Sequence, residues 1–100
     1  MHLVSIPPLL AFAAKHPAAR QAILSWCDEL KKSKWSRSAD IKARYASASI
    51  LKSRRVVFNL KEDDYRLVVA VAYNTGFVFV KFIGTHAEYG GVDADTVEMY

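Results

Sequence analysis

The sequence has few of the residues that cross-link or divide a chain. It holds one cysteine, four glycines and three prolines in 100 residues. The lone Cys27 excludes an internal disulfide and a cysteine-based metal site, and we expect it to be an inert core thiol. No low-complexity run or Pro/Gly-rich linker is present, which predicts one domain over residues 1–100.

Long hydrophobic runs are absent as well. The longest apolar stretch, residues 67–73, is far shorter than the ~20 residues that span a bilayer. Residues 7–14 are apolar, but no basic segment precedes them as it would in a secretory signal. We therefore expect a cytoplasmic protein with no membrane segment.

What the sequence does contain favours a globular, basic protein. Hydrophobic residues make up 52% of the chain and the net charge is +4. Basic residues crowd its middle, as they would on a nucleic-acid-binding surface or on an ordinary solvated helix. The residues that we expect to contact RNA, if RNA is the partner, are Lys32, Lys34, Arg37, Lys42, Arg54 and Arg55.

Periodicity predicts helices in the first half and strands in the second. A short strand should cover residues 2–6, followed by helices at 8–15, 17–32 and 38–45, the last with Ser38 as N-cap. Strands should follow at 55–60, 65–73 and 77–85, with a helical turn after Asp93. The pattern predicts an α+β fold in which the helices cover one face of a mostly antiparallel sheet.

Alternation within the strands assigns side chains to the two faces. Leu67, Val69, Val80 and Phe82 should point toward the helices, with Ile83 on the opposite face. That opposite face should be open and cationic, and it should carry Arg55, Arg66 and Lys81. Such a face can be ordinary surface or a binding site.

The segment after the last predicted strand holds three groups suited to proton chemistry. His86, Glu88 and Tyr89 lie on what we expect to be a glycine-flanked loop. An imidazole titrates near neutrality and a phenol can position or protonate an oxygen, although a lone loop histidine is usually just a surface residue. The spacing of His86 and Glu88 has no second His or Cys cluster beside it, so we predict no metal and no cofactor.

The same residues carry a family resemblance over nearly the whole chain. The run Lys-Phe-Ile-Gly-Thr-His-Ala-Glu-Tyr at 81–89 resembles the HigB family of toxin mRNA endonucleases in the RelE superfamily, as do residues 56–59, 65–69 and 92–97 and the early helical half. Two departures stand out, because Gly90-Gly91 replaces the family's usual Asp-Lys-type pair and the turn before Tyr65 is acidic rather than glycine-rich.

The resemblance implies a RelE-like fold and metal-independent cleavage of mRNA, commonly on ribosomes, neutralised by a helix-turn-helix (HigA-like) antitoxin. Arg66, Lys81, His86 and Tyr89 become the candidate catalytic residues. The two cations would stabilise phosphoryl charge, and His86 and Tyr89 would transfer protons in an order that the sequence leaves open. Lys81 is a further candidate base if it is desolvated.

Three other functions fit the same residues. One is a non-catalytic RNA-binding module in which His86 and Tyr89 stack on bases. Another is a structural subunit whose sheet face is covered by a partner. The third is a degenerate toxin that keeps only its antitoxin-binding surface.

Overall fold

Five strands form one open sheet in the order β1-β5-β4-β3-β2. The structure is a computed structural model and describes residues 1–4 and 6–98. β1 pairs with β5 in parallel and every other neighbouring pair is antiparallel. The strands are β1 His2–Val4, β2 Ser49–Ile50, β3 Arg55–Leu60, β4 Tyr65–Ala72 and β5 Phe77–Thr85.

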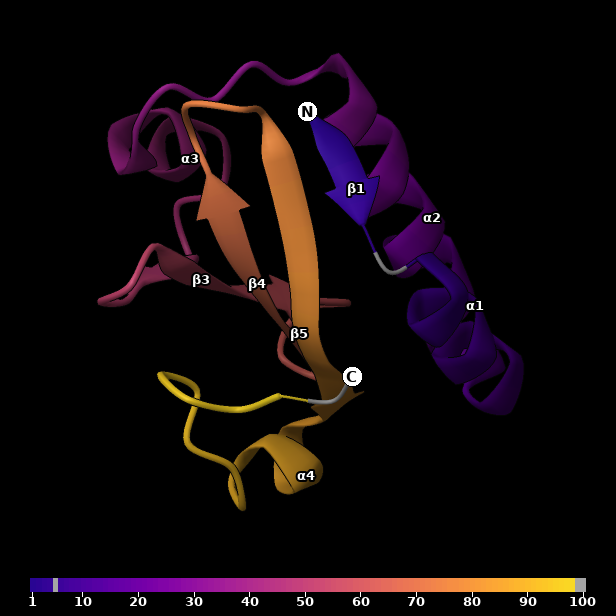
Figure 1. Ribbon diagram of the computed structural model, residues 1–100. Helices are drawn as coiled ribbons and strands as arrows, with labels where there is room; N and C mark the ends of the chain where they lie inside the picture. Colours follow the sequence, from indigo (N-terminus) through magenta and orange to yellow (C-terminus); the bar gives the residue numbers. More distant parts are fainter. Residues whose placement is uncertain (5, 99–100) are drawn as a thin grey trace.

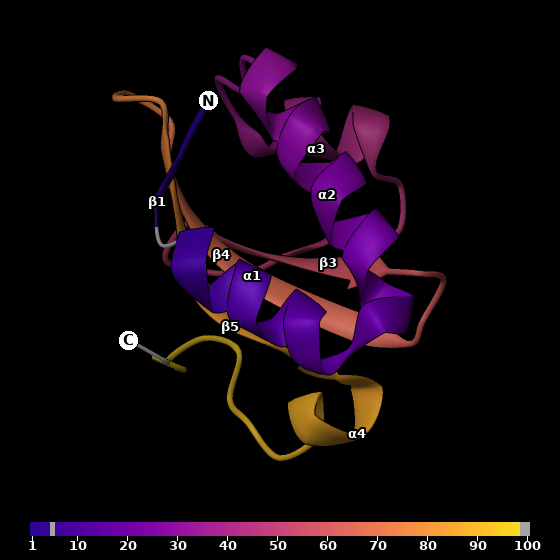
Figure 2. The same cartoon turned by 90° about the vertical axis from the view of Figure 1, so that its right-hand side faces the viewer.

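The three longer helices come before the main hairpins, as expected. They are α1 Ile6–Lys15, α2 Pro17–Lys32 and α3 Ser38–Arg44, and a single-turn helix, α4 His86–Tyr89, follows β5. In Figures 1 and 2, α1 and α2 lie along one side of the sheet and α4 lies beyond the end of β5. The predicted α+β architecture and the bounds of α2 and β5 are confirmed.

Several element ends differ from the prediction. Ile6 begins α1 instead of ending a strand, and Ser5 lies outside the described residues. Arg37, not Ser38, is the N-cap of α3, and the Asp40 carboxylate accepts hydrogen bonds from the backbone N–H groups of Ser36 and Arg37. The side chain that closes this helix start therefore comes from inside the first turn.

Helices and sheet enclose a core in which aromatic rings surround Phe58. This residue of β3 is 1% exposed, and its ring lies 5.3 Å from that of Trp26 and 5.0 Å from that of Tyr45. The ring of Trp35 stacks on it at 6.1 Å. Residues from α2 and from the segments on either side of α3 are therefore held against the sheet at one point.

Val78, Val80 and Ile83 of β5 join this core. Val78 and Val80 pair with Val71 and Val69, but Phe82 pairs with Val68 and Ile83 with Leu67, so Lys81 is an extra residue in a β-bulge. The prediction that Phe82 faces the helices and Ile83 the opposite side was wrong. It assumed strict alternation along β5, and the extra residue Lys81 reverses the alternation from Phe82 onward.

Truncating Phe58 should show how far the fold depends on this core. We expect Phe58→Ala to lower the free energy of unfolding by about 3–5 kcal/mol, the usual cost of removing a buried aromatic ring. Phe77→Ala, at a position 40% exposed, should cost less than about 1 kcal/mol. Urea unfolding followed by circular dichroism measures both, and equal losses would contradict this account of the core.

Candidate functional site

The face of the sheet opposite α1 and α2 carries the predicted cations. Arg55 pairs with Ala70 and Val57 with Val68, so Arg55, Val57, Val68 and Arg66 share this face. Lys81 reaches the same carboxylate as Arg55, which places it there too. The prediction that Arg66 and Lys81 share a face is confirmed. We call this side of the sheet the cationic face.

The cationic face is not open, as the sequence led us to expect. A second, smaller apolar cluster of Val57, Val68 and Phe82 is buried on it. Tyr89, Val92, Ala94 and Val97 pack against this cluster. Figure 1 shows the C-terminal segment in yellow, passing across the lower end of the molecule beyond β5. The predicted turn after Asp93 is part of this cover, because Val97 N–H bonds to Asp93 O at 2.8 Å.

Arg66 and Tyr89 form a pair at one end of the cationic face. The Arg66 guanidinium carbon lies 5.8 Å from the centre of the Tyr89 ring, and Nη1 donates to Asp63 O at 2.9 Å. The Tyr89 ring also lies 6.4 Å from that of Phe82. A cation over a ring face is attracted by the ring quadrupole, so the two side chains orient each other.

Gly84 makes room for this arrangement. A Cβ built at this position would lie 2.5 Å from Phe82 Cζ, closer than real Cβ atoms come. Phe82 therefore folds over its own strand where that strand has no side chain. The Phe-Ile-Gly spacing of the sequence motif thus has a steric reason.

His86 and Tyr89 are presented by a helical turn rather than by the loop that the sequence suggested. Thr85 is the N-cap of α4: its Oγ1 accepts a hydrogen bond from Glu88 N–H at 3.1 Å, and its own N–H donates to Glu88 Oε1 at 2.8 Å. This is a capping box, which the Thr-x-x-Glu spacing could have predicted. His86 N–H also donates to Asp64 O at 2.9 Å and ties α4 to the turn before β4.

Glu88 and His86, both on α4, have different surroundings. The hydrogen bond from the Thr85 backbone N–H is the main cause that lowers the pKa of Glu88 below its ordinary value. The ionised Glu88 carboxylate therefore stabilises the fold fully at a pH above its pKa in the unfolded chain. This stabilisation is lost as the pH falls through the lower pKa of Glu88 in the folded protein. His86 is exposed, and its imidazole makes no hydrogen bond or ring contact within the described part of the chain.

Lys81 and Arg55 meet at the other end of the face on one carboxylate. Lys81 Nζ lies 3.0 Å from Glu98 Oε1, and Arg55 Nη2 lies 3.5 Å from Glu98 Oε2. Arg55 is 8% exposed, and its Nη1 donates to the carbonyls of Val97 at 2.7 Å and Ala94 at 3.2 Å. Arg55 is thus buried beneath the C-terminal segment, and sequence reasoning, which placed it on an RNA-binding surface, missed Glu98.

The other predicted RNA contacts differ from Arg55 in their surroundings. Lys32, Lys34, Arg37 and Arg54 are exposed, and Lys34 and Arg54 both border hollows that include Tyr73 and Asn74. Lys42 Nζ instead donates to the carbonyls of Ala46 at 2.7 Å and Ala48 at 2.8 Å. Its charge therefore stabilises the loop after α3.

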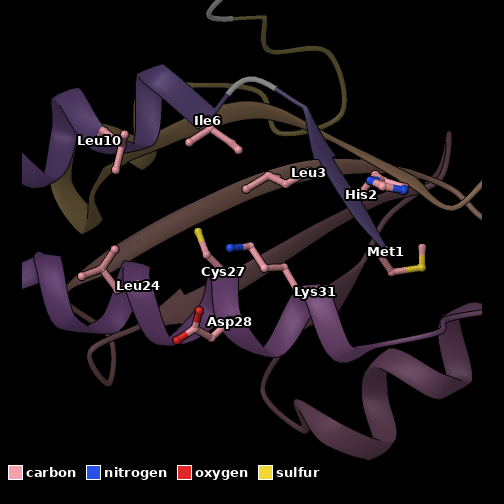
Figure 3. Close-up of a pocket in the computed structure, with 9 residues that line it drawn as sticks. All are labelled: Met1, His2, Leu3, Ile6, Leu10, Leu24, Cys27, Asp28 and Lys31. Carbon is pink, nitrogen blue, oxygen red and sulfur yellow. The ribbon is translucent and has the colours of Figure 1, made fainter.

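An apolar pocket is on the helical side of the molecule. Figure 3 shows it between β1, α1 and α2, with Leu3, Ile6 and Leu10 opposite Leu24 and Cys27. Burial is the main cause that raises the pKa of Cys27, which keeps the thiol protonated and unreactive near neutral pH. None of the candidate catalytic residues lines this pocket.

The described residues contain neither a metal-binding cluster nor a membrane-spanning helix. Among the described residues, no group of three or more His, Cys, Asp or Glu side chains lies close enough to hold a metal ion. No helix in the described ranges is both long and apolar enough to cross a membrane.

Comparison with known proteins identifies the family. A family model matches residues 19–92, and that model is the HigB toxin, the RelE-like toxic component of a toxin-antitoxin system. The chain belongs to this HigB toxin family. The match implies a toxin role and an antitoxin partner. No curated protein matches the chain closely enough to serve as a named relative.

The matched range of the HigB toxin family includes every candidate catalytic residue but not the whole covered face. Arg66, Lys81, His86 and Tyr89 lie within residues 19–92, and so does Arg55. Val97 and Glu98, which touch Arg55 and Lys81, lie outside it. The family match therefore says nothing about the contacts that Val97 and Glu98 make with the cationic face, and these come from the structure alone.

Removing the Thr85 hydroxyl should test the cap that holds α4 in this HigB toxin. We expect Thr85→Val to lower the free energy of unfolding by about 1 kcal/mol, the typical value of an N-cap hydrogen bond. Thr96→Val is the matched control, since Thr96 is exposed and its side chain makes no hydrogen bond within the described residues. Thermal unfolding at pH 7 compares them, and a similar effect for both would count against the capping box.

Proposed function

We propose that this protein is a metal-independent endoribonuclease that cleaves mRNA, in association with the ribosome, and so inhibits translation. The observation that carries the proposal is the presence of Arg66, Lys81 and Tyr89 on one sheet face, with His86 exposed on the same helical turn as Tyr89. The toxin family of the chain supports it. A cytoplasmic location follows from the substrate.

The chemistry is an internal attack on the RNA backbone. The ribose 2′-oxygen loses its proton to a base and forms a bond to the adjacent phosphorus, while the bond to the 5′-oxygen breaks. An acid gives a proton to that 5′-oxygen. The products are a 2′,3′-cyclic phosphate and a free 5′-hydroxyl, and no oxidant, metal or cofactor is required.

Each candidate residue has a role that suits its surroundings. Lys81 lies against a carboxylate, so we assign it to hold phosphoryl charge rather than to act as the base. Arg66 can grip phosphate oxygens in a bidentate way and is oriented by Tyr89. His86 and Tyr89 are the proton-transfer pair, three positions apart on α4 and hence neighbours on its surface.

The exposed basic residues supply the contacts that position the RNA. Lys32, Lys34, Arg37 and Arg54 would meet phosphates of mRNA or of the ribosome. Lys42 is exposed, but its Nζ already donates to two backbone carbonyls, so we assign it no phosphate contact. Arg55 is buried and is not part of this exposed surface. The partner that neutralises the toxin would be an antitoxin with a helix-turn-helix domain.

Cleavage should not depend on a divalent metal. Purified protein should cleave mRNA in the absence of ribosomes, whose assembly itself needs Mg²⁺, at the same rate with and without EDTA and leave a 2′,3′-cyclic or 3′-phosphate end. We expect this because charge on the phosphoryl oxygens is stabilised by protein cations. Gel analysis and end-group labelling of the fragments measure the result, and loss of this ribosome-free cleavage in EDTA would refute the mechanism.

Two substitutions should separate chemistry from binding. His86→Ala and Lys81→Ala should each lower the rate at saturating RNA by about 10²-fold, the usual scale for a proton-transfer group or charge stabiliser. Lys32→Ala should mainly weaken binding and leave the saturated rate nearly unchanged. Wild-type rates for both site variants would instead favour a non-catalytic RNA-binding module or a toxin that keeps only antitoxin binding.

A further inference from the structure

We infer that Arg55 and Lys81 form one binding site for an RNA phosphate, and that the Glu98 carboxylate occupies this site in the free protein as a built-in competitor. The inference rests on the proposed function for the identity of the ligand. The observation behind it is the convergence of two cations from different strands on one carboxylate.

The geometry of the contact is that of an anion site. Lys81 Nζ lies 3.0 Å from Glu98 Oε1, and Arg55 Nη2 lies 3.5 Å from Glu98 Oε2. Each cation therefore takes a different oxygen of the same group. Two non-bridging oxygens of a phosphodiester can be gripped in the same way, since both groups carry a negative charge shared between two oxygens.

Arg55 uses its two terminal nitrogens for separate purposes. Nη1 donates to the carbonyls of Ala94 and Val97, while Nη2 faces Glu98. The first contact fixes the C-terminal segment, and the second contributes charge to the site. Arg55 can therefore exchange one anion for another at Nη2 without giving up the backbone contacts that keep it buried.

Glu98 is the part of the site that can leave. Its side chain is 50% exposed, against 10% for Arg55 and 25% for Lys81. The segment itself is held upstream, by Val97 and Ala94 on the second apolar cluster and on Arg55. Exchange thus needs only a rotation of the Glu98 side chain and not the release of the segment.

The carboxylate competes at neutral pH because it remains ionised there. The hydrogen bond from Lys81 is the main cause that lowers the pKa of Glu98, and Arg55 adds to it. An RNA phosphate must therefore displace a charged carboxylate. This displacement reduces the binding free energy that the RNA gains from Arg55 and Lys81.

The site is distinct from the Arg66–Tyr89 pair. Arg66 and Ala70, the partner of Arg55, are four residues apart on β4, or about 13 Å at the usual rise of a strand. The second apolar cluster lies between them. The Arg55–Lys81 site and the Arg66–Tyr89 pair are therefore two separate cationic groups along the same sheet face.

Neutralising Glu98 tests the inference. The probe is a single-stranded DNA oligonucleotide, which lacks the 2′-hydroxyl and so cannot be cleaved by the proposed mechanism. Glu98→Gln should lower its Kd about three- to tenfold, because binding no longer breaks two partly exposed ion pairs. Salt dependence gives a second measurement. Each phosphate that the freed cations newly neutralise should steepen the slope of log Kd against log salt by about 0.7.

Asp95→Asn is the charge-matched control in the same segment. Asp95 is exposed and its side chain has no ion pair within the described residues. The Kd of Asp95→Asn for the oligonucleotide should therefore differ from that of the wild type by less than about twofold. In a Lys81→Met background the gain from Glu98→Gln should shrink toward that of the control. Equal melting temperatures for the variants would show that the fold is retained.

The outcomes separate this inference from the proposed function. Tighter binding by Glu98→Gln alone supports the competitor even if no cleavage of RNA is seen. Equal effects of Glu98→Gln and Asp95→Asn, or no binding by either, would overturn the inference even if the wild-type protein cleaves mRNA.

Discussion

The β-bulge at Lys81 is the constraint on which the rest of this structure depends. One extra residue in β5 shifts the alternation of its side chains between Val80 and Phe82. Before the bulge, Val78 and Val80 serve the core beneath the helices, and after it Ile83 takes over that role. Lys81 and Phe82 are thereby both available to the cationic face. Without the bulge, Phe82 would point toward the helices and the second apolar cluster would lose its largest member.

The second cluster explains how a short C-terminal segment stays on the sheet. Val57, Val68 and Phe82 offer an apolar patch, and Tyr89, Val92 and Val97 are among the residues that cover it. Arg55 adds two hydrogen bonds to carbonyls of the segment. A buried cation is costly without partners, and here backbone oxygens and a carboxylate supply them. The same residue therefore links the stability of the segment with the charge of the site.

The larger core and the candidate catalytic cations thus lie on opposite faces of one sheet. The helical side holds the aromatic core around Phe58 and the apolar pocket with Cys27. The other side holds Arg66, Lys81 and Tyr89, three of the four candidate catalytic residues that we propose. Successive side chains of β4 point to opposite faces of the sheet. A substitution at Val68 or Arg66, which both face away from the helices, need not disturb the helices.

The sequence by itself determined the α+β class, the bounds of α2 and β5, and the family. These follow from local periodicity and from short motifs, which one chain carries in linear order. It also placed Arg66 and Lys81 on one face, because strand alternation holds on each side of the bulge. The capping box of α4 was readable as Thr-x-x-Glu, although we expected a loop there.

Only the tertiary structure decided what covers the cationic face. A bulge depends on how two strands pair, so no alternation within β5 could place Phe82 or Ile83. The partnership of Glu98 with Arg55 and Lys81 joins residues that are 43 and 17 positions apart, and long-range ion pairs leave no periodic signal. For the same reason the sequence placed Arg55 on an open face, whereas the fold buries it under the C-terminal segment and pairs it with Glu98.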